Sequence, residues 1–221
     1  DYRKILVCTL ECARKSGLPY YHRMRHDGYF RHLLVRKAVK TEEILIDIVT
    51  ASEEGFDSKP KEFLNKWAAA LQALELTGKI VGILHTKNDS LADIVKDEGT
   101  EVLFGQDYFY EELLGLKFKI TPFSFFQTNS LGAEVLYEKA REYIGDTNEK
   151  VVFDLYSGTG TIAQILAPVA KKVVGVEIVE EAVEAAKVNA KLNGLDNCTF
   201  WAGDVLKVID ELGEVPDLIM L

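Results

Sequence analysis

The chain has 221 residues with a formal net charge of −9, and 48% of its residues are hydrophobic. That content suffices for a buried core and excludes an intrinsically disordered chain. No run of eighteen apolar residues occurs, so we expect no membrane-spanning helix and no membrane partner. The three cysteines are too few for a disulfide scaffold, which favours a reducing, cytoplasmic setting.

The charge is unevenly distributed along the chain. Residues 1–40 carry ten Lys or Arg against three acids, a net of +7, whereas residues 41–221 have a net of −16. Clustered positive charge is typical of nucleic-acid-binding surfaces, although an ordinary solvated surface explains it equally well. Cys8 and Cys12 have no further ligands nearby, so we expect no metal site. Because the first residue is not Met, we expect the natural N-terminus to lie upstream.

The first part of the chain predicts a small α+β domain over residues 1–122. Ile44, Ile46 and Ile48 recur at every second position and so share one face of a strand, and Phe63, Leu64 and later apolar residues recur at helical spacing. The predicted elements are strands at Arg31–Ala38 and Glu43–Thr50, joined as a hairpin, a helix at Pro60–Leu76, and strands at Ile80–His85, Glu101–Phe104 and Leu116–Ile120.

Residues 123–221 predict an α/β domain with a parallel sheet, because strand and helix signals alternate strictly. The predicted elements are a helix at Ser130–Ile144, a strand at Val151–Tyr156, a helix at Thr161–Ala170, a strand at Val173–Ile178, a helix at Glu180–Asn193, a strand at Cys198–Ala202, a helix at Val205–Leu212 and a strand at Asp217–Leu221. The order is that of a Rossmann-like fold, which we expect to continue beyond Leu221.

A glycine-rich turn joins the first strand of this fold to the next helix. Gly158 and Gly160 allow the backbone to turn tightly and to approach a ligand, and Thr161 begins the helix, whose first N–H groups lack intrahelical partners. Glu177 ends the following strand, where a carboxylate can accept hydrogen bonds from both hydroxyls of a ribose. The arrangement predicts a nucleoside-containing cofactor.

Two acids favour S-adenosylmethionine over a dinucleotide, although the Gly158-x-Gly160-x-x-Ala163 spacing also fits dinucleotide binding. Asp154 closes the first strand, where it could meet a cationic ligand rather than a pyrophosphate. Asp204 follows the third strand and could accept from an adenine amino group. It could also cap the next helix, and the two roles are compatible.

Five motifs, in this order, resemble those of the RNA uracil-C5 methyltransferases of the TrmA/RumA type. They are Arg31–Arg36 (RHLLVR), Gly82–Thr86 (GILHT) with Asn88-Asp89, Pro122–Asn129 (PFSFFQTN), Asp154–Thr161 (DLYSGTGT) and Gly175–Ile178 (GVEI). The third motif is far more specific than the glycine turn, and together the motifs cover nearly the whole chain. The resemblance implies a class I methyltransferase fold that is incomplete at its C-terminus.

The resemblance also implies contacts with S-adenosylmethionine. The matching residues are Gln127, Tyr156 and Glu177, while Ser157 stands where many members have Cys. On the residues alone, Gln127 could instead cap the helix near Asn129, and Tyr156 could be part of the core.

The implied reaction explains why the end of the chain matters. In the family a cysteine thiolate adds to carbon 6 of uracil, carbon 5 takes the methyl group, and a carboxylate removes the carbon-5 proton. The Asp-Pro-Pro motif, the Cys nucleophile and the Glu base are expected beyond Leu221, so we expect no catalytic residue within this chain and no turnover by it. The expected substrate is structured RNA, with ribosomal RNA favoured over transfer RNA.

Three basic residues are candidates for contacting this RNA: Arg31, His32 and Arg36. A salt-bridged sheet surface is the alternative interpretation, with equal weight. Two other functions also stay open at this point. One is a nicotinamide-dependent oxidoreductase, and the other is a non-catalytic RNA-binding domain with a vestigial cofactor fold.

Overall fold

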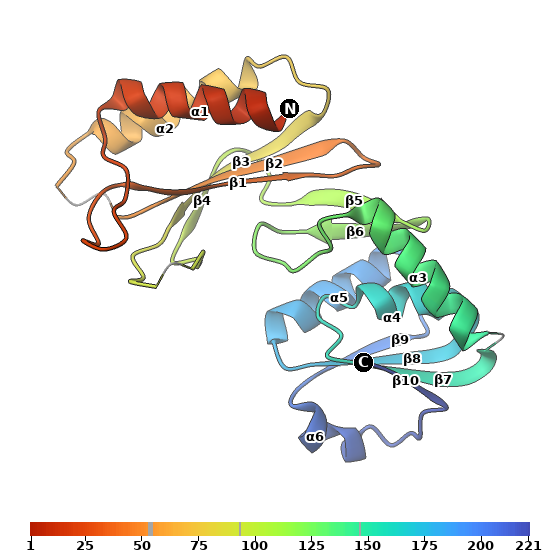
Figure 1. Cartoon of the computed structure of the whole chain (residues 1–221). Coiled ribbons are helices and arrows are strands. Elements are labelled where there is room, and N and C mark those ends of the chain that lie inside the picture. The colour runs from red at the N-terminus through yellow and green to blue at the C-terminus, as the bar shows by residue number, and fades with distance from the viewer. Residues whose placement is uncertain (53–54, 93, 146) are drawn as a thin grey trace. The chain divides into compact units, whose positions relative to one another are not determined.

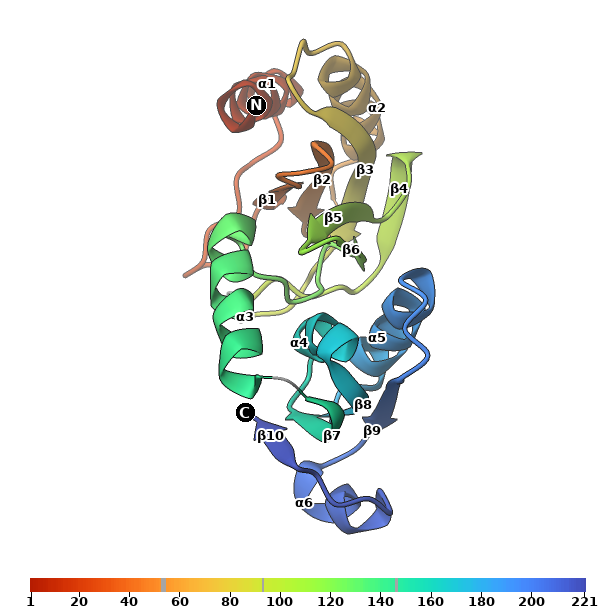
Figure 2. The same cartoon turned by 90° about the vertical axis from the view of Figure 1, so that its right-hand side faces the viewer.

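The computed structural model describes residues 1–52, 55–92, 94–145 and 147–221, and they form two compact units (Figures 1 and 2). The first unit comprises Asp1–Phe109 with Thr121–Phe123, and the second comprises Tyr110–Ile120 with Ser124–Leu221. No helix in the described part of the chain is long and apolar enough to cross a membrane.

The first unit is a four-stranded sheet covered by two helices. Its elements are α1 (Tyr2–Ser16), β1 (Phe30–Lys37), β2 (Glu43–Thr50), α2 (Lys59–Gln72), β3 (Lys79–Lys87) and β4 (Thr100–Gly105). The strand order is β1-β2-β3-β4, with β2 and β3 parallel and the other two pairs antiparallel. The predicted β1–β2 hairpin is therefore confirmed. Helices α1 and α2 lie side by side on one face of the sheet (Figure 1).

Helix α1 is a feature that our sequence analysis missed. Ile5 and Ala13 are buried against the sheet, and Thr9 is buried between them. The Trp67 indole of α2 donates a 2.9 Å hydrogen bond to Thr9 Oγ1, which satisfies two buried polar groups at the centre of the helix pair. Gly17 ends α1 in the left-handed conformation.

The second unit is a parallel four-stranded sheet with helices on both faces. Its elements are β5 (Phe109–Leu113), β6 (Leu116–Ile120), α3 (Ser130–Ile144), β7 (Thr147–Leu155), α4 (Thr161–Leu166), β8 (Ala170–Glu177), α5 (Glu180–Leu192), β9 (Cys198–Ala202), α6 (Val205–Val208) and β10 (Leu218–Met220). The sheet order is β10-β7-β8-β9, and each neighbouring pair is parallel as predicted. Helices α4 and α5 cover one face, and α6 covers the other (Figure 1).

The β5–β6 hairpin corrects the predicted domain boundary at residue 122. Asn189 of α5 and its C-cap residue Asn193 accept hydrogen bonds from the backbone N–H groups of Lys119 and Lys117, both at 2.8 Å, and their side-chain amides donate back to the carbonyls. These four bonds attach β6 to the second unit, so residues 110–120 belong with the sheet that follows them.

Three predicted helices are shorter in the structure. α2 ends at Gln72 rather than Leu76. α4 ends at Leu166 and continues as one 3₁₀ turn, Ala167–Val169, where Pro168 has no backbone N–H to donate to a further helical turn. α6 likewise gives way after one turn to a 3₁₀ turn at Ile209–Glu211.

Candidate cofactor-binding site

The turn between β7 and α4 is held by backbone hydrogen bonds. Tyr156 adopts a left-handed conformation, with φ at 63°, and redirects the chain at the end of the strand. Ser157 N–H donates to the Val176 carbonyl at 3.0 Å, and Gly160 N–H donates to the Ser157 carbonyl at 2.9 Å. Both distances are typical of amide hydrogen bonds. The turn is thereby fixed to the neighbouring strand β8.

The two glycines of the turn have different surroundings. A Cβ added to Gly158 would meet no atom within 4 Å, so its backbone is open to a ligand. A Cβ added to Gly160 would lie 2.6 Å from Phe200 and 2.8 Å from Ala186. Gly160 is therefore required for packing against Phe200 and Ala186, and its contact with a cofactor stays a prediction. Our sequence analysis missed Phe200, because an aromatic residue on a strand gives no sign of which glycine it contacts.

Glu177 lies at the centre of the site. Its Oε2 accepts from Gly158 N–H at 2.9 Å, and its Oε1 accepts from Val179 N–H at 3.0 Å. Its backbone carbonyl accepts from Gly203 N–H at 2.8 Å, so one residue connects the glycine turn to the loop after β9. Each carboxylate oxygen has two acceptor positions, which leaves capacity for two ligand hydroxyls. The side chain is half-buried and thus accessible.

The prediction that Asp154 meets a cationic ligand needs correction. The residue is only 3% exposed, and its Oδ2 accepts from Ala163 N–H at 2.9 Å, inside the first turn of α4. Burial raises the pKa of this carboxyl to about 7, although the Ala163 bond opposes the shift. Asp154 therefore supports the glycine turn from beneath. Thr161 begins α4, with its hydroxyl 3.5 Å from that of Thr159.

Asp204 is the N-cap of α6, as one of our two interpretations predicted. Its Oδ1 accepts from Leu206 N–H at 3.0 Å. The side chain is 41% exposed, so a ligand can still reach the carboxylate. The capping and ligand-binding interpretations therefore remain compatible.

Gln127 and Tyr156 both have exposed side chains. Tyr156 is 66% exposed, which excludes the alternative that it is a core residue. Gln127 is exposed in the segment before α3, and the helix cap is provided by Asn129, whose side chain accepts from Gly132 N–H at 2.9 Å. The capping alternative for Gln127 is therefore wrong, and both residues are accessible to a ligand.

The predicted RNA-contacting residues lie in the first unit, away from this site in the sequence. Arg31 donates to the carbonyls of Asn88, at 2.7 Å, and Ala92, at 3.2 Å, and its guanidinium lies 4.2 Å from the centre of the Tyr21 ring. These contacts give Arg31 a structural role in holding the segment after β3. His32 and Arg36 are half-buried on β1, and burial lowers the pKa of Arg36.

The cysteines do not have the surroundings of activated thiols. Burial and the neighbouring Cys12 raise the pKa of Cys8 to about 11, and burial and Asp154 raise that of Cys198 to about 12. No group of three or more metal-ligating side chains occurs among the residues that the structure describes.

Residues 146–220 match a family model described as "Methyltransferase domain". A solved tRNA (uracil-54, C5)-methyltransferase from Pyrococcus abyssi, in complex with S-adenosyl-L-homocysteine, has a TM-score of 0.76 to this chain at 24% sequence identity. The likeness covers 99% of this chain and 50% of that chain. This protein therefore has a class I methyltransferase fold, preceded by an α+β unit, as the sequence predicted.

The curated relatives are also named as methyltransferases. An uncharacterized RNA methyltransferase of Clostridium tetani is 52% identical over 100% of this chain and 47% of its own length. One from Caldanaerobacter subterraneus subsp. tengcongensis is 49% identical over 100% of this chain and 48% of its own length. The chain thus spans about half the length of the curated relatives it matches. The methyltransferase match disfavours the nicotinamide-dependent oxidoreductase that we kept as an alternative.

Proposed function

We propose that this chain is the cofactor-binding part of an S-adenosylmethionine-dependent RNA methyltransferase that modifies carbon 5 of uridine in structured RNA. The observation that carries the proposal is the Glu177 carboxylate, held by Gly158 and Val179 N–H groups with two acceptor positions left. The names of the curated relatives support RNA as the substrate. The resemblance in Pro122–Asn129 supports uridine carbon 5, and ribosomal RNA is the expected substrate class.

The residues present fit such a cofactor. Glu177 accepts from the two ribose hydroxyls, and its orientation is fixed because each oxygen already holds a backbone N–H. The open backbone at Gly158 allows close approach of the ligand. Tyr156 offers an exposed ring for packing, Gln127 offers an amide for the methionine end, and Asp204 offers a carboxylate for an adenine amino group.

Within this proposal the chain's residues bind and orient, and the cofactor supplies the methyl group. Methylation at carbon 5 needs a thiolate nucleophile, and raised pKa values leave Cys8 and Cys198 protonated near neutral pH. Cys12 lies on α1 in the other unit. The proposal therefore assigns the nucleophile and the base to parts of the full-length protein outside these 221 residues.

The test is methyl transfer by the full-length protein, with tritiated S-adenosylmethionine and total RNA, followed by mapping of the labelled nucleoside. We expect label in 5-methyluridine and its loss in Glu177→Gln, which removes one acceptor oxygen. Glu180→Gln is the matched control, because Glu180 is an exposed acid at the start of α5. Label in another nucleoside would refute the uridine assignment, and unchanged activity of Glu177→Gln would refute the site.

A further inference from the structure

The two helices of the first unit form a basic surface on an acidic chain. They carry seven exposed cationic residues, namely Arg3, Lys4, Arg14 and Lys15 on α1 and Lys59, Lys61 and Lys66 on α2. Their only acids are Glu11 and Glu62, which leaves a net charge of +5 on the α1–α2 layer, while the whole chain has −9. Positive charge concentrated in this way attracts polyanions despite the net negative charge.

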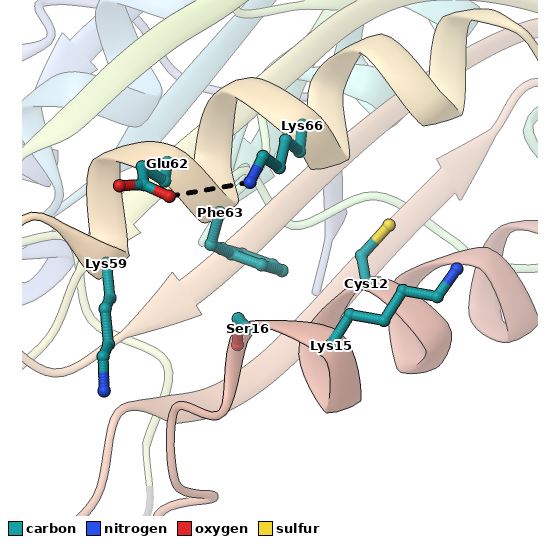
Figure 3. Close-up of a pocket in the computed structure, with 7 residues that line it drawn as sticks. All are labelled: Cys12, Lys15, Ser16, Lys59, Glu62, Phe63 and Lys66. Atoms are coloured by element: carbon teal, nitrogen blue, oxygen red, sulfur yellow. Dashed lines mark ion pairs between the residues drawn. The ribbon is translucent and has the colours of Figure 1, made fainter.

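A pocket of about 270 Å³ lies in this layer, between the end of α1 and the start of α2 (Figure 3). Three lysines line it: Lys15 from α1 and Lys59 and Lys66 from α2. In Figure 3 the Phe63 ring extends from α2 into the space between the helices, and Lys15 and Lys59 extend on either side of it. The pocket is therefore a hollow with an apolar floor and a cationic rim.

Glu62 does not cancel this charge. Its Oε2 lies 3.5 Å from Lys66 Nζ, and its Oε1 accepts from Ser58 Oγ at 3.4 Å. Even with Glu62 counted, the pocket lining has a net charge of +2. The positive end of the α2 dipole adds to this charge, because the pocket borders the first turn of that helix. A cationic ligand would be repelled by this pocket, whereas an anionic ligand would be stabilised.

We propose that the α1–α2 layer binds the phosphodiester backbone of RNA, with Lys15, Lys59 and Lys66 contacting phosphates around the pocket. The proposal rests on the proposed function for its choice of RNA among polyanions. Flexible ammonium groups on an exposed rim suit backbone contacts that do not depend on base sequence. The Arg31 guanidinium, by contrast, already donates to two backbone carbonyls. The proposal therefore assigns the main phosphate contacts to the α1–α2 layer rather than to Arg31.

The test compares two triple variants of the full-length protein in binding a fluorescein-labelled RNA hairpin, between about 50 mM and about 200 mM KCl. In K15Q/K59Q/K66Q we expect the slope of log affinity against log salt to fall by about 2, and affinity at 0.1 M salt to weaken by up to about 100-fold. The matched control is K171Q/K187Q/K191Q, which removes three exposed lysines of the second unit and should keep the wild-type slope.

Glu62→Gln provides a second variant that leaves every lysine in place. It removes the acid beside Lys66, so we expect tighter RNA binding and a steeper salt slope. A wild-type slope in K15Q/K59Q/K66Q, or an equal loss in the control triple, would overturn the proposal. That failure is distinct from failure of the proposed function, because methyl transfer tests the second unit and the salt slope tests the first.

Discussion

Asp154→Asn separates a supporting role for this residue from a cofactor-binding role. The carboxyl is 3% exposed and accepts one hydrogen bond from Ala163 N–H. Asn retains an acceptor oxygen at that position but cannot ionise. Burial raises the pKa of Asp154 from its ordinary value of 3.8 to about 7, so the folded protein binds a proton here more tightly than the unfolded chain does.

The sign of the pH dependence follows from that difference. Stability from a raised carboxyl pKa is fully present below the unfolded pKa and is lost as pH rises through the folded pKa. The change in the Asp154 pKa from 3.8 to about 7 corresponds to about 4 kcal/mol of stability in full, of which about 2–3 kcal/mol is lost between about pH 5 and about pH 8. Because Asn does not titrate, the stability of Asp154→Asn relative to wild type should rise by that amount over the same window.

Urea unfolding at both pH values, followed by Trp201 fluorescence in a Trp67→Phe background, measures this difference for the second unit. Any fixed cost of burying the Asn amide appears at both pH values and cancels in the comparison. An equal relative stability at about pH 5 and about pH 8 would show that Asp154 does not have a raised pKa in the folded protein. A large loss of S-adenosylhomocysteine affinity in this variant, with the fold retained, would restore the cofactor-contacting role.

Three further predictions concern packing and reactivity. Gly160→Ala should destabilise the second unit by about 2–4 kcal/mol, because its Cβ would overlap Phe200 at a positive φ, whereas Gly158→Ala should cost only about 1 kcal/mol; urea unfolding distinguishes them. Arg31→Ala should speed amide hydrogen exchange in the segment after β3, because the free energy that protects these amides should fall by about 1–3 kcal/mol. Unchanged exchange would contradict the structural role of Arg31. Cys198 should react with iodoacetamide at about pH 8 at least about 100-fold more slowly than free cysteine, since its pKa is raised to about 12.

The second unit was readable from the sequence because its signals are local and repetitive. Strand β7, the glycine turn and strand β8 follow one another within a short stretch, and the apolar strands alternate with helices. The β5–β6 hairpin was assigned to the wrong part because its attachment depends on Asn189 and Asn193, about seventy residues further along the chain. Helix α1 was missed because one of its buried positions is Thr9, a polar residue whose partner, Trp67, lies on another helix.

Within the site, position along a motif was easier to predict than orientation. Glu177 and Gly158 lie next to each other, as the strand–turn–helix–strand pattern indicated. The pattern could not show that Gly160 packs on Phe200 or that Asp154 turns towards α4, because both depend on which face of the sheet a side chain occupies. The role of Arg31 was likewise invisible, since its partners are backbone carbonyls after β3.

The most direct test of the cofactor site is a calorimetric titration of this chain with S-adenosylhomocysteine, beside Glu177→Gln, Glu180→Gln and an NADH control. We expect selective binding of the nucleoside, weakened at least about tenfold in Glu177→Gln and unchanged in Glu180→Gln, because the Glu177 carboxylate contacts the glycine turn whereas Glu180 is an exposed acid at the start of α5. Equal affinities in both variants, or tighter binding of NADH, would contradict it.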